Sequence, residues 1–139
     1  MAKNAICPPL CCPMIRKFAE NIEKTVASTP LVISSNIQKQ FDPEDETVYL
    51  KGNLLFIDFS VLDIAIFANK YSNKIAVDKY RFHYMTKEGQ LLFRYDNAPH
   101  HREIPTFPHH KHTSNEILQS SMPFLKDVIN EIAAILIKK

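Results

Sequence analysis

The side chains best suited to chemistry are concentrated in one stretch of this 139-residue chain, from Tyr80 to His112. The stretch contains all six histidines of the chain, together with arginines, aromatic residues and prolines. An imidazole titrates near neutral pH and can act as an acid or a base, and a guanidinium group can hold a phosphate through paired hydrogen bonds. Because a core has little use for titratable rings, the stretch predicts a functional site presented at a sheet edge.

The formal charge of this stretch also differs from that of the rest of the chain. The chain carries a net charge of +2 with neutral histidines, and the rest of the chain sums to zero. The charged residues of the stretch are Arg81, Lys87, Arg94, Arg102 and Lys111 against Glu88, Asp96 and Glu103. Protonation of the histidines would add positive charge, which an anionic ligand could itself promote. The alternative is ordinary surface charge, and composition alone favours this alternative.

The elements that must position this stretch can be predicted from hydrophobic periodicity. Apolar residues at spacings of three and four predict a helix from Pro13 to the Ser28–Pro30 turn. Strands are expected at 31–41, at 48–59 and 61–69 as a hairpin, and at 75–85, and each is bounded by turn residues. Asp63, in the second arm of that hairpin, is either a functional acid or an outward strand residue, and we favour the second interpretation.

The turn from Thr86 to Gly89 joins two strands, and its register decides which residues share a face. With Met85 opposite Gln90, the aromatic residues pair across the strands: Tyr80, Phe82 and Tyr84 with Tyr95, Phe93 and Leu91. Arg81, His83 and Arg94 then share the opposite face. A bulge at Gly89 would instead shift the partners by one and mix the two groups. We favour the first register because it separates an aromatic face from a basic one, and we expect Phe82 and Phe93 to be buried beneath the helices.

After this hairpin the chain is rich in prolines as far as Pro108, and it cannot continue as a central strand. We expect it to pass over or beside the basic face and to bring histidines there. The final segment, from Ser120 to Lys139, begins with serine caps and an early proline, shows apolar residues at helical spacing and ends in lysines. It therefore predicts a C-terminal helix.

Together these elements predict the fold class α+β, with a twisted antiparallel β-sheet of about five strands packed against N- and C-terminal helices. Residues 13–139 are expected to form a single domain, and residues 1–12 a weakly ordered tail. The tail carries Cys7, Cys11 and Cys12, whose spacing fits neither a disulfide framework nor a zinc site. With 45% hydrophobic and 23% charged residues and no apolar run long enough to span a membrane, the chain is expected in the cytoplasm.

Three runs of residues carry a family resemblance: YRFHY (Tyr80–Tyr84), RYDNAPHH (Arg94–His101) and TFPHHKH (Thr106–His112). They closely resemble the TumE-like family of small prokaryotic toxins, and the similarity extends over about residues 30 to 137. The resemblance implies one component of a toxin–antitoxin pair whose partner is a helix-turn-helix antitoxin. The chemistry of the toxin does not follow from it.

The residues themselves favour a metal-independent ribonuclease. RNA cleavage needs a base for the 2′-hydroxyl, an acid for the leaving 5′-oxygen and cations around the phosphate, and histidine and arginine suit these roles. We assign catalysis to His83, His100 and His110. We assign substrate binding to Arg81, Arg94, Tyr84, Tyr95, Asp96, Asn97, His101, Lys111 and His112. Several of these have a structural alternative: His83 as a hydrogen-bonded strand residue, and Asp96 and Asn97 as turn formers.

Two other hypotheses remain open. One is a metal-binding protein, in which His110 and His112 point the same way on extended chain and Asp96 or His100 completes the ligand set. Against it, the sequence has neither a CxxC nor an HExxH motif, so no cofactor and no metal ligand are assigned. The other is a non-catalytic module that binds an antitoxin. The expected partners are the antitoxin, RNA and a second copy in a homodimer, with no membrane.

Overall fold

The computed structural model describes residues 12–138, so the expected tail lies outside the described residues except for Cys12, which is a free thiol. The first helix, α1 (Met14–Ala27), begins after Pro13 and ends before the Ser28–Pro30 turn, as the sequence predicts. Its buried residues recur at spacings of three and four, which places one apolar stripe against the sheet: Ile15, Ala19, Ile22 and Val26.

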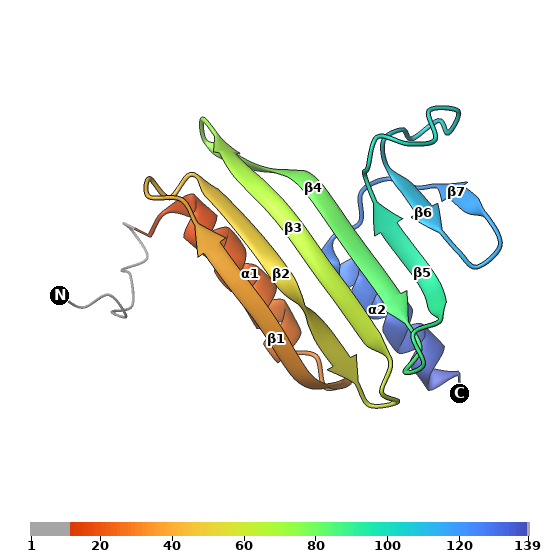
Figure 1. Cartoon of the computed structure of the whole chain (residues 1–139). Helices are drawn as coiled ribbons and strands as arrows, with labels where there is room; N and C mark the ends of the chain where they lie inside the picture. Colours follow the sequence, from red (N-terminus) through yellow and green to blue (C-terminus); the bar gives the residue numbers. More distant parts are fainter. Residues whose placement is uncertain (1–11, 139) are drawn as a thin grey trace.

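All the strands of the described part of the chain form one antiparallel sheet, and their spatial order follows their order in the sequence (Figure 1). The strands are β1 (Val32–Phe41), β2 (Thr47–Phe56), β3 (Val61–Tyr71), β4 (Lys74–Met85), β5 (Leu91–Asp96), β6 (His110–His112) and β7 (Ile117–Gln119). The predicted fold class is correct, but the sheet has seven strands rather than five. The two additional strands, β6 and β7, have three residues each, which is too short to show a period of two.

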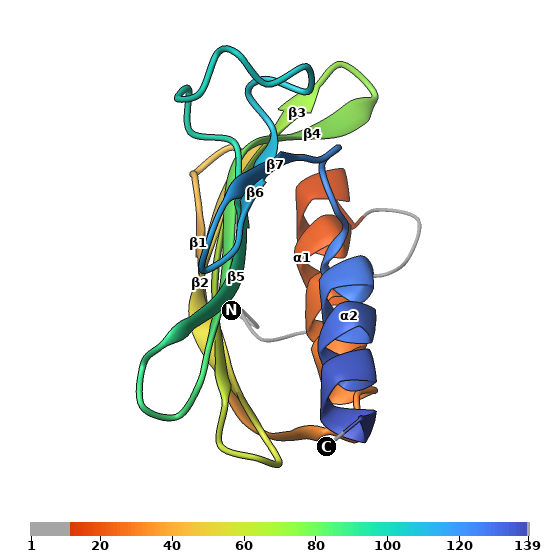
Figure 2. The same cartoon turned by 90° about the vertical axis from the view of Figure 1, so that its right-hand side faces the viewer.

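The two helices pack side by side on the same face of the sheet, and no helix of the described residues lies over the opposite face (Figure 2). Residues of β3 alternate between the two faces, so that Leu62, Ile64, Ile66 and Ala68 are buried beneath the helices. The side chains of Phe82 and Phe93 are each 3% exposed and belong to the same core, which confirms the predicted orientation of the hairpin. We call the uncovered side the open face.

The hairpin of β4 and β5 has a different register from the one predicted. Phe82 pairs with Tyr95 and Tyr84 with Phe93, two positions from the expected partners, and a bulge follows at Met85, which pairs with Leu91. A shift of two positions restores every side chain to its original face, because strand residues alternate with a period of two. The predicted partners are therefore wrong, whereas the separation of an aromatic face from a basic one is correct.

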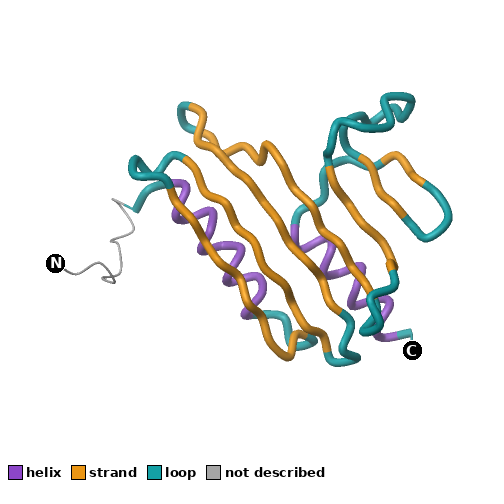
Figure 3. Tube along the Cα trace, in the orientation of Figure 1, coloured by secondary structure: helices purple, strands orange, loops and turns teal. Residues whose placement is uncertain are grey.

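The proline-rich passage between β5 and β6 consists of consecutive turns at one end of the sheet (Figure 3). The N–H groups of Ile104, Phe107 and His109 each donate to the carbonyl three residues earlier. The Thr106 hydroxyl donates to the His109 carbonyl and accepts from the Ser120 N–H, so the passage is tied to the segment that leaves β7. These bonds fix the direction in which β6 enters the sheet.

The C-terminal helix, α2 (Leu125–Ile137), buries Leu125, Val128, Ile129 and Ile132, as expected from their spacing. Its N-terminus differs from the prediction, because Phe124 and not a serine is the N-cap. The Asp127 carboxylate accepts the Phe124 N–H at 2.9 Å, which also places a negative charge in the first turn of the helix. Within residues 12–138, no helix is both long and apolar enough to cross a membrane.

Candidate functional site

The register of the sheet aligns the chemically active residues in a row across the open face. His83 on β4 lies opposite Arg94 on β5, and Arg94 lies opposite His112 on β6. On the other side of β4, Asp63 of β3 lies opposite His83. Adjacent strands are about 4.8 Å apart, so the two histidines lie roughly 10 Å apart along the row with the guanidinium-bearing residue between them.

A second row lies two residues further along each strand, on the same face. It contains Arg81, Asp96 and His110. Asp96 is buried and is the centre of the polar contacts in both rows. Its Oδ1 accepts the Ala98 N–H and lies 3.0 Å from His110 Nε2, and its Oδ2 lies 2.9 Å from Arg94 Nε. The Arg94 contact is an ion pair by distance, without the alignment of a hydrogen bond. His112 Nε2 lies 3.7 Å from the same Oδ2.

His110 is held on both sides. Its Nδ1 lies 2.8 Å from the carbonyl oxygen of Pro108, which can only accept, so Nδ1 carries a proton. Its Nε2 faces Asp96, and the side chain is 2% exposed. His110 therefore holds the end of the proline-rich passage against Asp96, and its ring is not open to solvent.

His83 is less buried than His110, and within residues 12–138 no hydrogen bond to a neighbouring residue fixes its ring. Partial burial, followed by the positive charge of Arg94, lowers the pKa of His83 from its ordinary value of 6.5, although the Asp63 carboxylate acts in the opposite direction. A lowered pKa keeps the imidazole neutral at physiological pH, which is the form that accepts a proton.

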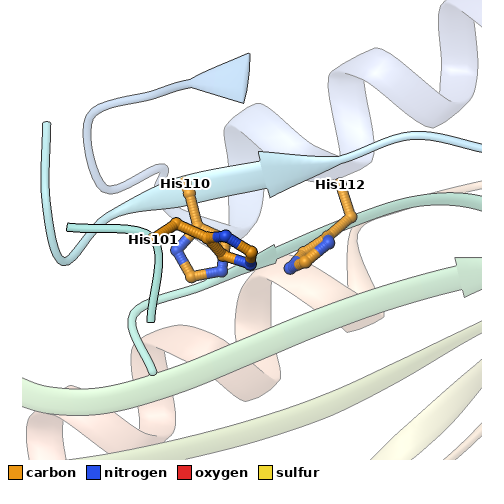
Figure 4. A group of neighbouring side chains, drawn as sticks. All are labelled: His101, His110 and His112. Atoms are coloured by element: carbon orange, nitrogen blue, oxygen red, sulfur yellow. The ribbon is translucent and has the colours of Figure 1, made fainter. Parts of the chain in front are cut away.

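Three histidines meet at the edge of this site (Figure 4). His110 and His112 extend from β6, and His101 comes from the proline-rich passage, where its backbone has a φ of 59°. The ring centroids are 4.8 Å apart for His110 and His112, 5.3 Å for His101 and His110, and 5.7 Å for His101 and His112. Burial lowers the pKa of His112, and the charge of Asp96 partly opposes this effect.

Three residues assigned to substrate binding lie on the helix-covered side instead. Tyr84 is fully buried, and its hydroxyl lies 2.7 Å from the Ser60 hydroxyl, so its ring cannot stack on a base. Tyr95 donates to Oε1 of Glu131 at 2.6 Å, and Lys111 Nζ lies 2.7 Å from Oε2 of the same residue on α2. Tyr95 and Lys111 therefore attach β5 and β6 to the helix layer.

Asn97 and His100 also lie apart from the two rows. The Asn97 side chain accepts the Tyr80 N–H and donates to the Asp78 carbonyl, and so extends the pairing of β5 with β4 by one residue. This role is structural, but it lies in strand pairing and not in the turn that was the alternative considered for Asn97. His100 is exposed in the proline-rich passage, and its ring centroid lies 6.3 Å from that of His101.

Residues that the sequence analysis did not select complete the open face. Tyr49 of β2 lies opposite Phe67 of β3, and Phe67 lies opposite Lys79 of β4. With Gln40 and Arg81 they line a hollow of about 580 Å³ beside the row that contains Arg81 and Asp96. An exposed tyrosine beside a half-buried phenylalanine on the uncovered face of a sheet is a surface on which a nucleobase can stack. The alternation of side chains between the two faces in 48–59 and 61–69 could be read from the sequence. Which of the two faces is exposed could be identified only after the helices were placed.

Comparison with known proteins identifies the family. A family model described as "Toxin TumE" matches residues 22–138, which is most of the chain. Searches of curated proteins and of solved structures each returned no match. The family match agrees with the resemblance carried by the motifs that provide Arg94, Asp96, His110 and His112. On this evidence the chain belongs to the TumE toxin family, which implies a toxin role and, in general, an antitoxin partner.

Proposed function

We propose that this toxin cleaves single-stranded RNA on the open face without a metal ion. The observation that carries the proposal is the row in which Arg94 lies between His83 and His112 on three adjacent strands. A phosphate bound at Arg94 would have an imidazole on each side. That is the arrangement needed to remove a proton from one oxygen and deliver a proton to another.

In this mechanism His83 is the general base. Its lowered pKa keeps it neutral, and it takes the proton from the ribose 2′-hydroxyl. The 2′-oxygen attacks the phosphorus and the bond to the 5′-oxygen breaks, so the products are a 2′,3′-cyclic phosphate and a free 5′-hydroxyl. His112, on the far side of Arg94, donates a proton to the leaving oxygen. Burial lowers the pKa of His112 in the free protein, so the negative charge of the bound phosphate must favour its protonated form in the complex. Of the three histidines first assigned to catalysis, only His83 keeps that role, because His100 lies outside the row and His110 is enclosed.

The charged groups around the row stabilise the reacting phosphate. Arg94 and Arg81 supply positive charge as the negative charge of the transition state develops. Asp96 and His110 are positioning residues: the buried carboxylate holds the Arg94 side chain by its Nε, and His110 anchors the carboxylate from the other side. A guanidinium group held in place in this way needs little reorganisation when the phosphate binds.

The substrate is single-stranded because a flat aromatic surface adjoins the row. Tyr49 is 38% exposed, and Phe67 lies beside it across the sheet. A base that is unpaired can turn towards these rings, with its phosphate held by Arg81 and Lys79, whereas a base in a duplex cannot. Since such stacking tolerates any base, we expect little sequence preference at this position.

The test is incubation of the purified protein with single-stranded RNA in the presence of EDTA. We expect cleavage that leaves 2′,3′-cyclic phosphate ends, no cleavage of a substrate with 2′-deoxy sugars, and strong protection of the same RNA in a duplex. Cleavage of the 2′-deoxy substrate would contradict the mechanism, because the attacking group is then absent. Growth arrest by a protein that leaves all RNA intact would exclude the ribonuclease function.

For the partner, we propose a helix-turn-helix antitoxin that covers the open face, with the complex located in the cytoplasm, where the RNA substrate is found. The family supports an antitoxin in general, and the positive charges of Lys79, Arg81 and Arg94 on the open face support this face as the docking surface. Co-expression should suppress both growth arrest and RNA cleavage. Charge reversal of Lys79 to Glu should weaken capture of the antitoxin more than the same change at Lys74, which lies at the start of β4.

A further inference from the structure

The cluster of His101, His110 and His112 has a geometry that RNA cleavage does not require. Each residue offers one ring nitrogen, and these atoms all lie within 4.8 Å of one another. Three imidazoles bound to one tetrahedral ion at about 2.0–2.1 Å would have their nitrogens roughly 3.3 Å apart. The difference can be closed by rotation of the two less buried side chains, His101 and His112, while His110 stays in place.

The protonated nitrogen of His110 is a second, independent feature that suits a metal ligand. Its Nδ1 donates to the Pro108 carbonyl at 2.8 Å, which leaves Nε2 as the nitrogen for an ion. Nε2 lies 3.0 Å from Asp96 Oδ1, so a bound ion takes the place of any proton that Nε2 donates to this carboxylate. Histidine ligands of metals characteristically donate their other ring N–H to a carbonyl or carboxylate, since this fixes the ring and increases its basicity. His110 is 2% exposed, so the ring is held in this orientation before any ion arrives.

The Asp96 carboxylate supplies negative charge at the same place. Its oxygens lie 3.0 Å from His110 Nε2 and 3.7 Å from His112 Nε2. The buried carboxylate would partly neutralise a cation between these nitrogens. Its negative charge would also offset the repulsion between this cation and Arg94. Imidazole ligands select zinc and neighbouring transition metals over magnesium and calcium, which prefer oxygen ligands.

We propose that His101, His110 and His112 bind one divalent transition-metal ion of the zinc type, and that the bound ion inhibits the toxin. Metal binding does not rest on the ribonuclease proposal, because it follows from the three rings alone. The inhibitory effect does rest on it: an ion held by His112 removes that imidazole from proton transfer and draws Asp96 away from Arg94. The ion is therefore a regulator and not a cofactor of the reaction. This site replaces the expectation of no metal ligand and differs from the ligand sets considered in the sequence analysis.

Binding is tested on full-length protein without a histidine tag, stripped with EDTA and dialysed. A His83→Ala background is used so that the ribonuclease function plays no part in the measurement. We expect calorimetry to detect one equivalent of Zn²⁺ per chain. Co²⁺ should give the visible absorption of a tetrahedral site. Loss of a ligand in His101→Ala or His112→Ala should weaken binding by more than about 100-fold, because even partners beyond the ligands contribute 10- to 100-fold.

His100→Ala is the matched control, since it removes an exposed histidine adjacent in sequence to His101 and should leave the affinity unchanged. A second measurement excludes misfolding as the cause of lost binding. The His83→Ala protein, which keeps all three ligand histidines, is titrated with Zn²⁺ while the NMR resonances of its histidine ring protons are followed. Those of His101, His110 and His112 should shift, and that of His100 should not. Absence of a stoichiometric site, or binding that survives both ligand substitutions, would overturn metal binding. If Zn²⁺ binds but RNA cleavage by the wild-type protein continues unchanged, the metal site is correct and the inhibitory role is wrong.

Discussion

The two faces of β4 show how one strand can serve both folding and chemistry. Phe82 and His83 are adjacent in sequence, yet the ring of Phe82 is buried beneath the helices and the imidazole of His83 lies on the open face. The helix-covered face is closed by apolar packing, in which each side chain is fixed by many neighbours. The open face is held by a few polar contacts around Asp96. Substitutions on the two faces should therefore have separable effects on stability and on activity.

The largest effect is expected from His83→Ala. Loss of a proton-transfer group should reduce RNA cleavage by about 10²- to 10⁴-fold and abolish growth arrest. The free energy of unfolding should change by less than about 0.5 kcal/mol, because the side chain lies on the open face and not in the core beneath the helices. Cleavage assays and denaturant unfolding of the same preparation measure both quantities. Lys74→Ala, at the start of β4, serves as the control that should match wild type in each. Full cleavage by His83→Ala would show that another residue is the base.

Phe82→Ala should have the opposite pattern. Truncation of a buried aromatic ring leaves a cavity and costs about 3–5 kcal/mol of the free energy of unfolding. The open face should remain intact in the molecules that still fold, so cleavage per folded molecule should be close to wild type at low temperature. A large loss of activity per folded molecule would show that the two faces are coupled.

A smaller effect is expected where RNA meets the aromatic pair. Tyr49→Ala should weaken binding of single-stranded RNA by about 1–3 kcal/mol and leave the cleavage rate at saturating RNA nearly unchanged. Tyr49→Phe keeps the ring and should bind like wild type. Fluorescence anisotropy with a 2′-deoxy oligonucleotide measures binding without cleavage. Equal affinity of Tyr49→Ala and wild type would remove the hollow beside Arg81 from the substrate path.

The smallest effect concerns pH. A general base must be neutral, and burial together with Arg94 lowers the pKa of His83 below 6.5. Activity should therefore persist below pH 6.5 and fall only as the pH passes through the lowered pKa. The Asp63 carboxylate raises the pKa of His83, so Asp63→Asn should move this decline to still lower pH. The pH dependence of kcat/KM for the two proteins tests this, and a shift towards higher pH in Asp63→Asn would contradict it.

Much of the fold could be predicted from the sequence because its signals are local. The apolar stripe of α1, the alternation in β3 and the sorting of aromatic and basic residues on β4 and β5 all depend on spacing within one segment. Strand pairing was harder to predict. The turn places Met85 opposite Leu91 instead of Gln90, and the bulge next to Met85 shifts the register by one further position. β6 and β7 were too short to be recognised, so the position of His112 opposite Arg94 could not be foreseen.

The site was predicted less completely because residue type does not indicate what covers a side chain. Tyr95 and Lys111 have suitable chemistry for RNA, but Glu131 of α2 engages both of them beneath the sheet. Tyr49 and Phe67 read as ordinary strand residues in the sequence, and their exposure depends on which face the helices occupy. Long-range packing, and not local propensity, decides these assignments.

The order of the strands has a consequence for how the toxin is made. Because every strand pairs with the strand before it in the chain, the sheet can grow in the direction of synthesis with few distant contacts to wait for, which favours rapid folding. His83 and Arg94 come together when β5 forms, but His112 arrives only with β6, after the proline-rich passage. On the proposed mechanism, a nascent chain that ends before His110 has a phosphate site with one imidazole and cannot cleave RNA. The ribosome would thus have completed most of the polypeptide before an active toxin exists beside it.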